Sequence, residues 1–91
     1  MSKEDRFLAA ADMGAVNIVK EYLDNGVDVH YRCEHALLCA AYNGHYEVVA
    51  LLLCYGADPL VDGQLALEFA IEKNDVPMIN LLREWIETRE I

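Results

Sequence analysis

The chain repeats itself at an offset of thirty residues without a gap. Self-similarity at such a period indicates a repeat array, in which each unit buries its apolar face only against its neighbours. Eight identities join the first unit to the second: Leu8, Ala10, Ala11, Gly14, Val19, Leu23, Gly26 and Asp28 recur as Leu38, Ala40, Ala41, Gly44, Val49, Leu53, Gly56 and Asp58. A weaker third unit follows, in which Ala36, Leu37, Ala40, Leu51 and Leu52 recur as Ala66, Leu67, Ala70, Leu81 and Leu82.

Each unit carries the signals of two short helices joined by a tight turn. Gly14 and Gly44 suit the left-handed conformation that ends a helix, and Asn74, which replaces them in the third unit, also tolerates it. Asp75 is a candidate N-cap, and Pro77 is tolerated in the first turn after it. The pattern predicts helices over residues 7–13, 16–25, 36–42, 45–54, 65–72 and 76–89.

The second helix of the middle unit is far less polar than its counterparts. Within residues 46–54 only Glu47 is charged, so this helix is nearly apolar all round and has to be covered on several sides. The first unit has Lys20, Glu21 and Asp24 where the middle unit has Ala50, Leu51 and Cys54. This contrast predicts a linear stack with an apolar middle and solvated ends.

The outer units show which of their residues should face the core. In the first unit these are Val16, Ile18, Val19, Tyr22 and Leu23, and in the third they are Met78, Ile79, Leu82, Trp85 and Ile86. The residues expected to face solvent in the third unit are Asn80, Arg83, Glu84 and Glu87. Trp85 fits either core packing or a partly exposed anchor for a partner or a second copy.

Composition and charge limit the possible functions. A chain of 91 residues that is 55% apolar and 25% charged predicts one folded domain over residues 1–91, with repeats at about 5–34, 35–64 and 65–91. Its formal charge of −9 opposes binding to nucleic acid or to an anionic membrane surface. The acidity serves either solubility or a protein partner with a basic face.

The ends and the cysteines predict an intracellular protein of the cytoplasm or nucleus. The opening residues lack the pattern of a secretory signal, and the sequence has no apolar run of the length that a membrane span requires. The odd count of cysteines does not suit a disulfide framework. Cys33, Cys39 and Cys54 are therefore expected to be small buried or half-buried hydrophobic residues.

Catalytic and metal-binding patterns are absent or weak. His30, Cys33, His35 and Cys39 lie close together, but they lack a matched second pair of a known zinc-binding kind, and Cys39 falls at an inward helix position. Glu68 and Glu72, one turn apart, are expected to form a solvated face. The sequence also has no phosphate-binding loop or nucleotide fingerprint, so it predicts neither a cofactor nor an enzyme.

One stretch carries a resemblance to a known family. Residues 43–58 and the alanines before them resemble the ankyrin repeat through Gly44, His45, Glu47, Val48, Val49, Leu51, Leu52, Leu53, Gly56, Ala57 and Asp58. The family's Thr-Pro-Leu-His segment reads His35-Ala36-Leu37-Leu38 here, and the period is thirty rather than about 33 residues. The missing residues lie between Gly56 and Leu65. The resemblance implies an all-α solenoid of three helix-turn-helix repeats with shortened loops, similar to arrays of large DNA viruses.

The resemblance also implies where a partner would bind. In the family, partners dock on exposed inner-helix positions and on the loops, and His45 would hydrogen-bond a neighbouring loop backbone. The matching inner-helix residues are Asp12, Met13, Tyr42, Asn43, Glu72 and Lys73. The matching loop residues are His30, Tyr31, Arg32 and Glu34, with Leu60, Val61, Asp62 and Gln64 in the next loop. Tyr31 and Tyr42 are the best anchor candidates, because tyrosine combines contact area with few rotatable bonds.

The leading hypothesis is a non-catalytic module that binds, inhibits or tethers an intracellular protein. The alternative is a self-assembling structural unit, in which Trp85 and Ile86 at the open end join another copy.

Overall fold

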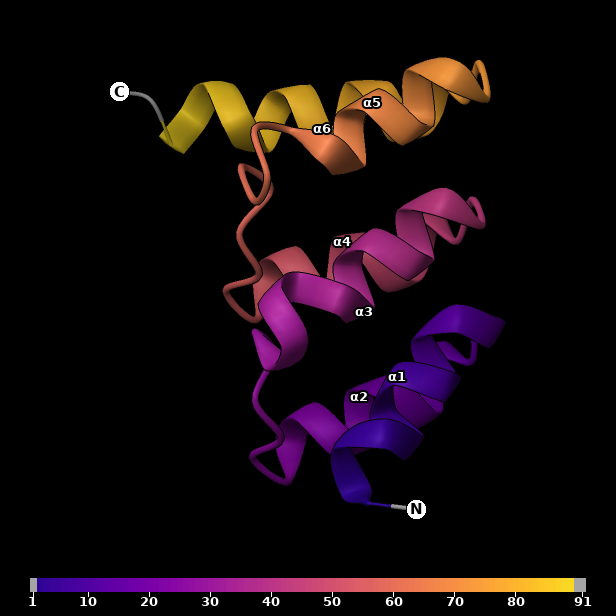
Figure 1. The fold of residues 1–91 in the computed structure, drawn as a ribbon, viewed down its shortest axis with the longest axis vertical. Helices are drawn as coiled ribbons and strands as arrows, with labels where there is room; N and C mark the ends of the chain where they lie inside the picture. Colours follow the sequence, from indigo (N-terminus) through magenta and orange to yellow (C-terminus); the bar gives the residue numbers. More distant parts are fainter. Residues whose placement is uncertain (1, 90–91) are drawn as a thin grey trace.

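The computed structural model describes residues 2–89, and this part of the chain forms three helix pairs and no β-strand. The helices are α1 (Lys3–Met13), α2 (Val16–Asp24), α3 (Tyr31–Tyr42), α4 (Tyr46–Cys54), α5 (Leu65–Glu72) and α6 (Val76–Arg89). The pairs are stacked one above another, with the tight turns on one side of the stack and the longer connections on the other (Figure 1). The all-α repeat architecture predicted from the sequence is confirmed.

The turn inside each pair is the same structure, repeated at intervals of thirty residues. Gly14, Gly44 and Asn74 all adopt positive φ angles, of 76°, 74° and 55°. In each turn the next residue donates its backbone N–H to the carbonyl oxygen five residues back: Ala15 to Ala10, His45 to Ala40 and Asp75 to Ala70, each at 2.9 Å. The predicted helix ends are thus confirmed at all three turns.

The connections between pairs also repeat. The carboxylates of Asp28 and Asp58 each accept a hydrogen bond from the backbone N–H two residues further on, at 2.9 Å. This local bond fixes the turn that leads into the next inner helix. The segment after Asp58 continues in turns up to α5, which agrees with the shortened loops expected from the sequence.

The core lies between the inner helices α1, α3 and α5 and the outer helices α2, α4 and α6. Inner-helix alanines at equivalent positions, Ala10, Ala40 and Ala70, are all buried, and their small size lets neighbouring pairs approach closely. In the third pair Met78, Leu82 and Ile86 are buried, while Ile79 and Trp85 are partly buried against the core. The predicted inward face of α6 is confirmed.

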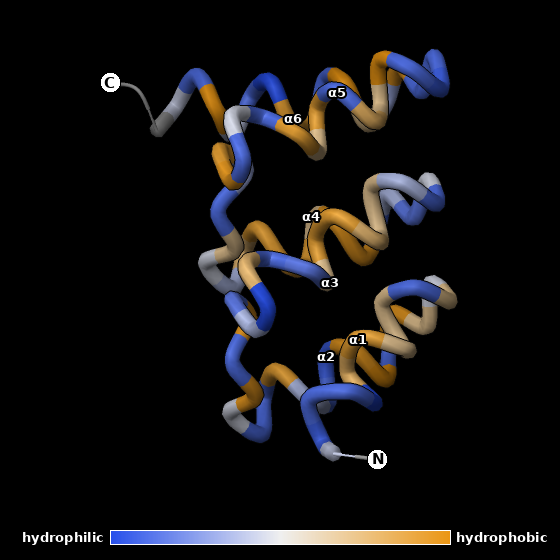
Figure 2. Tube along the Cα trace, in the orientation of Figure 1, coloured by the Kyte–Doolittle hydropathy of each residue, from blue (hydrophilic) through white to orange (hydrophobic). Residues whose placement is uncertain are grey.

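α4 is the most apolar of the helices α1 to α6, and the hydropathy colouring shows it as mainly hydrophobic, whereas α3 begins with hydrophilic residues and becomes hydrophobic further on (Figure 2). Val48, Val49, Leu52 and Leu53 of α4 are all buried, and α4 packs against both α2 and α6. The neighbouring helices nevertheless cover less of the surface of α4 than the sequence predicts. Cys54 is exposed, because α2 and α6 flank α4 while the outer side of the stack faces solvent.

The prediction that Ile18 faces the core is wrong. Its side chain is 51% exposed, whereas Val48 and Met78, thirty and sixty residues further on, are buried. The preceding repeat covers this position in the second and third units, and within residues 2–89 no repeat precedes α1 and α2, so Ile18 stays exposed.

Arginines limit the apolar surface at both ends of the stack. Arg6 occupies the repeat position that holds buried Ala36 and Ala66 in the later pairs. Arg83 occupies the position that holds buried Leu23 and Leu53 in the earlier pairs. Both arginines are exposed, so these two positions are polar at the ends of the described stack and apolar inside it.

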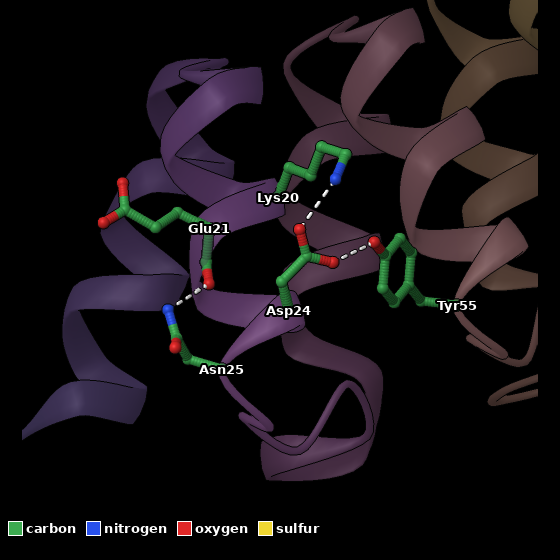
Figure 3. Close-up of polar contacts among 5 residues, drawn as sticks. All are labelled: Lys20, Glu21, Asp24, Asn25 and Tyr55. Carbon is green, nitrogen blue, oxygen red and sulfur yellow. Dashed lines mark hydrogen bonds and ion pairs between the residues drawn. The ribbon is translucent and has the colours of Figure 1, made fainter.

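A polar contact also links the first two outer helices (Figure 3). Lys20 Nζ lies 2.7 Å from Asp24 Oδ2, and the hydroxyl of Tyr55, just after α4, donates to Asp24 Oδ1. The hydrogen bonds from Lys20 and then Tyr55 lower the pKa of Asp24. All three groups are exposed to solvent, so this network contributes little to stability compared with the apolar core.

No helix within the described residues is long and apolar enough to cross a membrane.

The buried middle of α4 gives a direct stability test. We expect Leu52→Ala to lower the free energy of unfolding by about 2–5 kcal/mol, because it leaves a cavity between two packed neighbours. Cys54→Ala, on the exposed side of the same helix, should change it by less than about 0.5 kcal/mol. Urea unfolding followed by circular dichroism measures both, and equal effects would contradict the buried position of Leu52.

Candidate functional site

The turn between α1 and α2 is locked to the turn between α3 and α4. His45 Nε2 donates a hydrogen bond to the carbonyl oxygen of Asp12 at 2.8 Å, so this ring nitrogen carries the proton. Asn43 Nδ2 donates to the Asp12 carboxylate at 2.7 Å. A Cβ atom on Gly14 would lie only 2.6 Å from His45 Nδ1. The loop-binding role that the family resemblance implies for His45 is confirmed, and it holds two inner helices in register.

A groove of about 270 Å³ opens on the inner-helix side of the stack. Its lining comes from all three inner helices or the turns that end them: Asp12, His35, Leu38, Cys39, Tyr42, Asn43 and Phe69. Leu38, Cys39 and Phe69 are partly buried, and they form an apolar floor. The groove therefore exists only because the three repeats are stacked.

Tyr42 is the central aromatic residue of the groove. Its ring meets Phe69 edge to face, with ring centroids 5.2 Å apart and an interplanar angle of 83°. Lys73 Nζ lies 4.3 Å from the Tyr42 ring centroid, within the range of a cation–π contact. Tyr42 is 49% exposed and so remains accessible. Tyr42 therefore lines the groove, and its role as an anchor for a partner stays a prediction.

Acidic residues lie on either side of Tyr42. Asp12 and Glu72 occupy the same repeat position as Tyr42 in the first and third units, and both are exposed. Neighbouring packed helices are spaced by roughly 8–10 Å, so the three side chains form a row across the stack. Met13, Asn43 and Lys73 form the adjacent row, and all three are also exposed. The stack therefore brings together the six predicted inner-helix residues.

Tyr31 and Arg32 lie at the start of α3 and pack back towards α1. The Tyr31 hydroxyl donates to Asp5 Oδ1 at 3.4 Å. The Arg32 guanidinium lies 5.5 Å from the Tyr31 ring centroid and 4.0 Å from the same Asp5 oxygen. Tyr31 is only partly exposed, so it offers less free contact area than Tyr42.

The prediction that Glu34 belongs to the exposed loop strip is wrong. Arg32, Cys33 and Glu34 form a left-handed turn, with φ angles of 54°, 56° and 67°, and this turn leaves Glu34 only 5% exposed. One carboxylate oxygen bonds to His30 Nδ1, and the other has no hydrogen-bond partner among residues 2–89. The bond to Glu34 raises the pKa of His30.

The residues predicted in the second loop lie apart from the groove. Val61 is half-buried and Asp62 is exposed, in the turn segment before α5. Leu60 and Gln64 are also half-buried there, and none of the four lines the groove.

The cysteines differ from their predicted common role. Cys33 and Cys54 are exposed, which corrects the expectation that they are buried or half-buried. Cys39 is half-buried in the groove floor, and burial raises the pKa of its thiol. Within the described residues no three histidine, cysteine or acidic side chains come together in a way that could hold a metal ion.

The sequence reading missed the groove floor. It placed Cys39 at an inward helix position and did not single out Leu38 or Phe69 as part of a surface. The available signal was the thirty-residue period itself. Cys39 and Phe69 share one repeat position, and the first unit has only the small Ala9 there. A large apolar side chain at this position in the third unit, beside an exposed Tyr42, indicates a lined surface.

The repeated turns and stacked pairs define a helix-turn-helix repeat protein. The family model for ankyrin repeats in three copies matches residues 7–89, and the chain belongs to the ankyrin repeat family. It is similar to mask-1, an ankyrin repeat and KH domain-containing protein of Caenorhabditis elegans, with 36% identity over 81% of this chain. It is also similar to the ankyrin repeat protein FPV018 of fowlpox virus, with 37% identity over 87% of this chain. The matches span 3% and 12% of those two proteins.

The contact between Gly14 and His45 can be tested by adding one methyl group. Gly14→Ala places a Cβ against His45 in addition to the strain of a positive φ angle. Gly26→Ala is the matched control, because Gly26 also has a positive φ but no atom within 4 Å of an added Cβ. We expect Gly14→Ala to lower the free energy of unfolding by at least about 1 kcal/mol more than Gly26→Ala does. Equal losses in urea titrations would show that the turns are not locked together.

The pairing of His30 with Glu34 predicts a pH dependence. A folded-state pKa above the usual value of about 6.5 gives stability that is present below that value and is lost as pH rises through the folded pKa. Proton NMR titration should show a raised pKa for His30 and a return towards the usual value in Glu34→Gln. An unchanged His30 pKa in Glu34→Gln would contradict this pairing.

Proposed function

We propose that the chain is a non-catalytic binding module that holds a protein partner on its inner-helix face. Members of the ankyrin repeat family generally mediate protein–protein interactions rather than catalysis. The observation that carries the proposal for this chain is the groove around Tyr42, because it combines an apolar floor with an accessible aromatic side chain. Such a site suits the anchor residues that dominate protein interfaces.

The partner's chemistry follows from the charge of the chain. With a formal charge of −9, and with Asp12 and Glu72 on either side of Tyr42, the face suits a partner surface rich in lysine and arginine. Association with such a partner should slow steeply as salt is added. The predicted loop residues Tyr31, Arg32, Val61 and Asp62 extend the proposed face beyond the groove.

We also propose that binding takes place inside a cell, as inhibition or tethering of the partner. Two of the three free cysteines are exposed, and exposed thiols persist best in a reducing compartment.

Self-assembly is the second candidate. Ile71 favours it: its side chain is 50% exposed at the last inner helix, whereas the equivalent Ala11 and Ala41 are buried by the next repeat. Arg6 and Arg83 oppose it, because head-to-tail stacking would place a charged side chain at positions that hold a buried alanine or leucine inside the stack. Light scattering at two concentrations separates the candidates. A constant mass near 10.3 kDa rejects self-assembly, and a mass that grows with concentration supports it.

Two exposed tyrosines close together in the sequence give a matched test of the binding face. Tyr42 lines the groove and is 49% exposed, whereas Tyr46, at the start of the outer helix α4, does not line it and is 45% exposed. A partner captured from extract of the native cells and identified by mass spectrometry should bind Tyr42→Ala at least about tenfold more weakly than the unaltered chain. Tyr46→Ala should bind normally. Equal binding by both variants would reject the inner-helix face as the site.

A further inference from the structure

We propose that the groove recognises a basic peptide segment that inserts one apolar side chain beside a lysine or arginine. This inference rests on the proposed function, and it specifies the element of the partner that is read. The occupant is a stretch of another protein in which an aliphatic residue is flanked by cations. The groove floor, the charges around it and the position of one lysine each support this choice.

The floor accounts for the apolar side chain. Leu38, Cys39 and Phe69 are each partly buried by their own helices and partly open to the groove. Their remaining apolar surface is in contact with water in the free protein, and an aliphatic side chain placed on it would remove that contact. A partly open apolar floor of this kind gives affinity but does not select between apolar groups.

The charges around the floor account for the flanking cations. Asp12 lies at one side of Tyr42 and Glu72 at the other, one in each neighbouring repeat. The Asp12 carboxylate already accepts a hydrogen bond from Asn43, which holds it at the edge of the groove. A cation on one side of the inserted residue would therefore meet the positioned Asp12 carboxylate, and a cation on the other side would lie towards the exposed Glu72, whereas an acidic segment would be repelled.

In the free protein the Tyr42 ring already contacts a cation, the ammonium group of Lys73. This group lies 4.3 Å from the ring centroid, on an accessible aromatic face. The chain thus supplies its own cation at a position that an incoming lysine or arginine would take. Partner binding then requires Lys73 to move aside, so Lys73 competes with the partner's cation and does not contribute to its binding.

Other occupants fit these features less well. Nucleic acid is disfavoured by the net charge of −9. A second copy of this chain would bring the same excess of acid to an acidic rim. A small apolar molecule would use the floor but not the two carboxylates.

Three synthetic peptides test the proposal by NMR titration of the ¹⁵N-labelled full chain. The first has one leucine between pairs of arginines, the second replaces that leucine with glycine, and the third replaces the arginines with glutamates. We expect the first to shift the amide signals of Leu38, Tyr42 and Phe69 and to bind at least about tenfold more tightly than either of the others. Equal binding of the first and second overturns the apolar anchor, and equal binding of the first and third overturns the charge selection.

Variants of the chain locate the effect in the groove. Asp12→Asn with Glu72→Gln should weaken the leucine–arginine peptide at least about fivefold, and the asparagine keeps the acceptor used by Asn43. Glu21→Gln with Glu84→Gln removes the same charge from exposed positions on the outer helices and should leave binding within about twofold. Equal losses in the two double variants would show that only the net charge matters, which overturns the site.

Lys73→Gln gives the sharpest outcome, because damage to the fold cannot imitate it. Removal of the competing ammonium should strengthen binding of the leucine–arginine peptide by about threefold or more. Weaker binding would overturn the role assigned to Lys73. These outcomes are independent of the tyrosine test above: a native partner lost on Tyr42→Ala, with no preference among the peptides, would leave the proposed function standing and reject this inference alone.

Discussion

The burial of the middle helix pair between two neighbours is the constraint on which the rest of the structure depends. Val49 and Leu52 are buried because α4 packs against both α2 and α6. The inner helices are held in the same way through Ala40 and its equivalents. Since each unit is too small to bury its own apolar face, the three repeats gain their structure from each other. The register of one pair on the next is thereby fixed.

That fixed register is also what creates a surface with chemical character. Residues thirty apart in the sequence come to lie in rows, so Asp12, Tyr42 and Glu72 meet although each belongs to a different repeat. The bond from His45 to the Asp12 carbonyl holds the row at its turn end. The floor of the groove forms in the same way, from α3 and α5 together. A face assembled on packed helices is rigid, and rigidity limits the entropy lost when a partner binds.

The sequence predicted much of this structure because its strongest signals are local and repeated. Gly14, Gly44 and Asn74 marked the ends of the inner helices, since each position needs a left-handed conformation. The rows of predicted binding residues followed from the resemblance to the ankyrin repeat, and the thirty-residue period aligns them. Ile18 was misplaced because helical periodicity gives the face of a helix but not whether a neighbour covers it. Glu34 was misplaced because three successive left-handed residues have no recognisable sequence signal without glycine. The groove floor was missed because Leu38 and Phe69 are apolar residues whose partial exposure depends on the stack.

Native-state hydrogen exchange measures the central claim most directly, because it reports how much unfolding each helix requires before its amides meet water. If the middle pair is held from both sides, the interior amides of α3 and α4 should exchange only through global unfolding. Those of α1 and α6, each with a neighbour on one side, should exchange through smaller openings and at least about tenfold faster. Exchange in α4 as fast as in α6 would contradict the account, because the register that builds the groove would then have no protected centre.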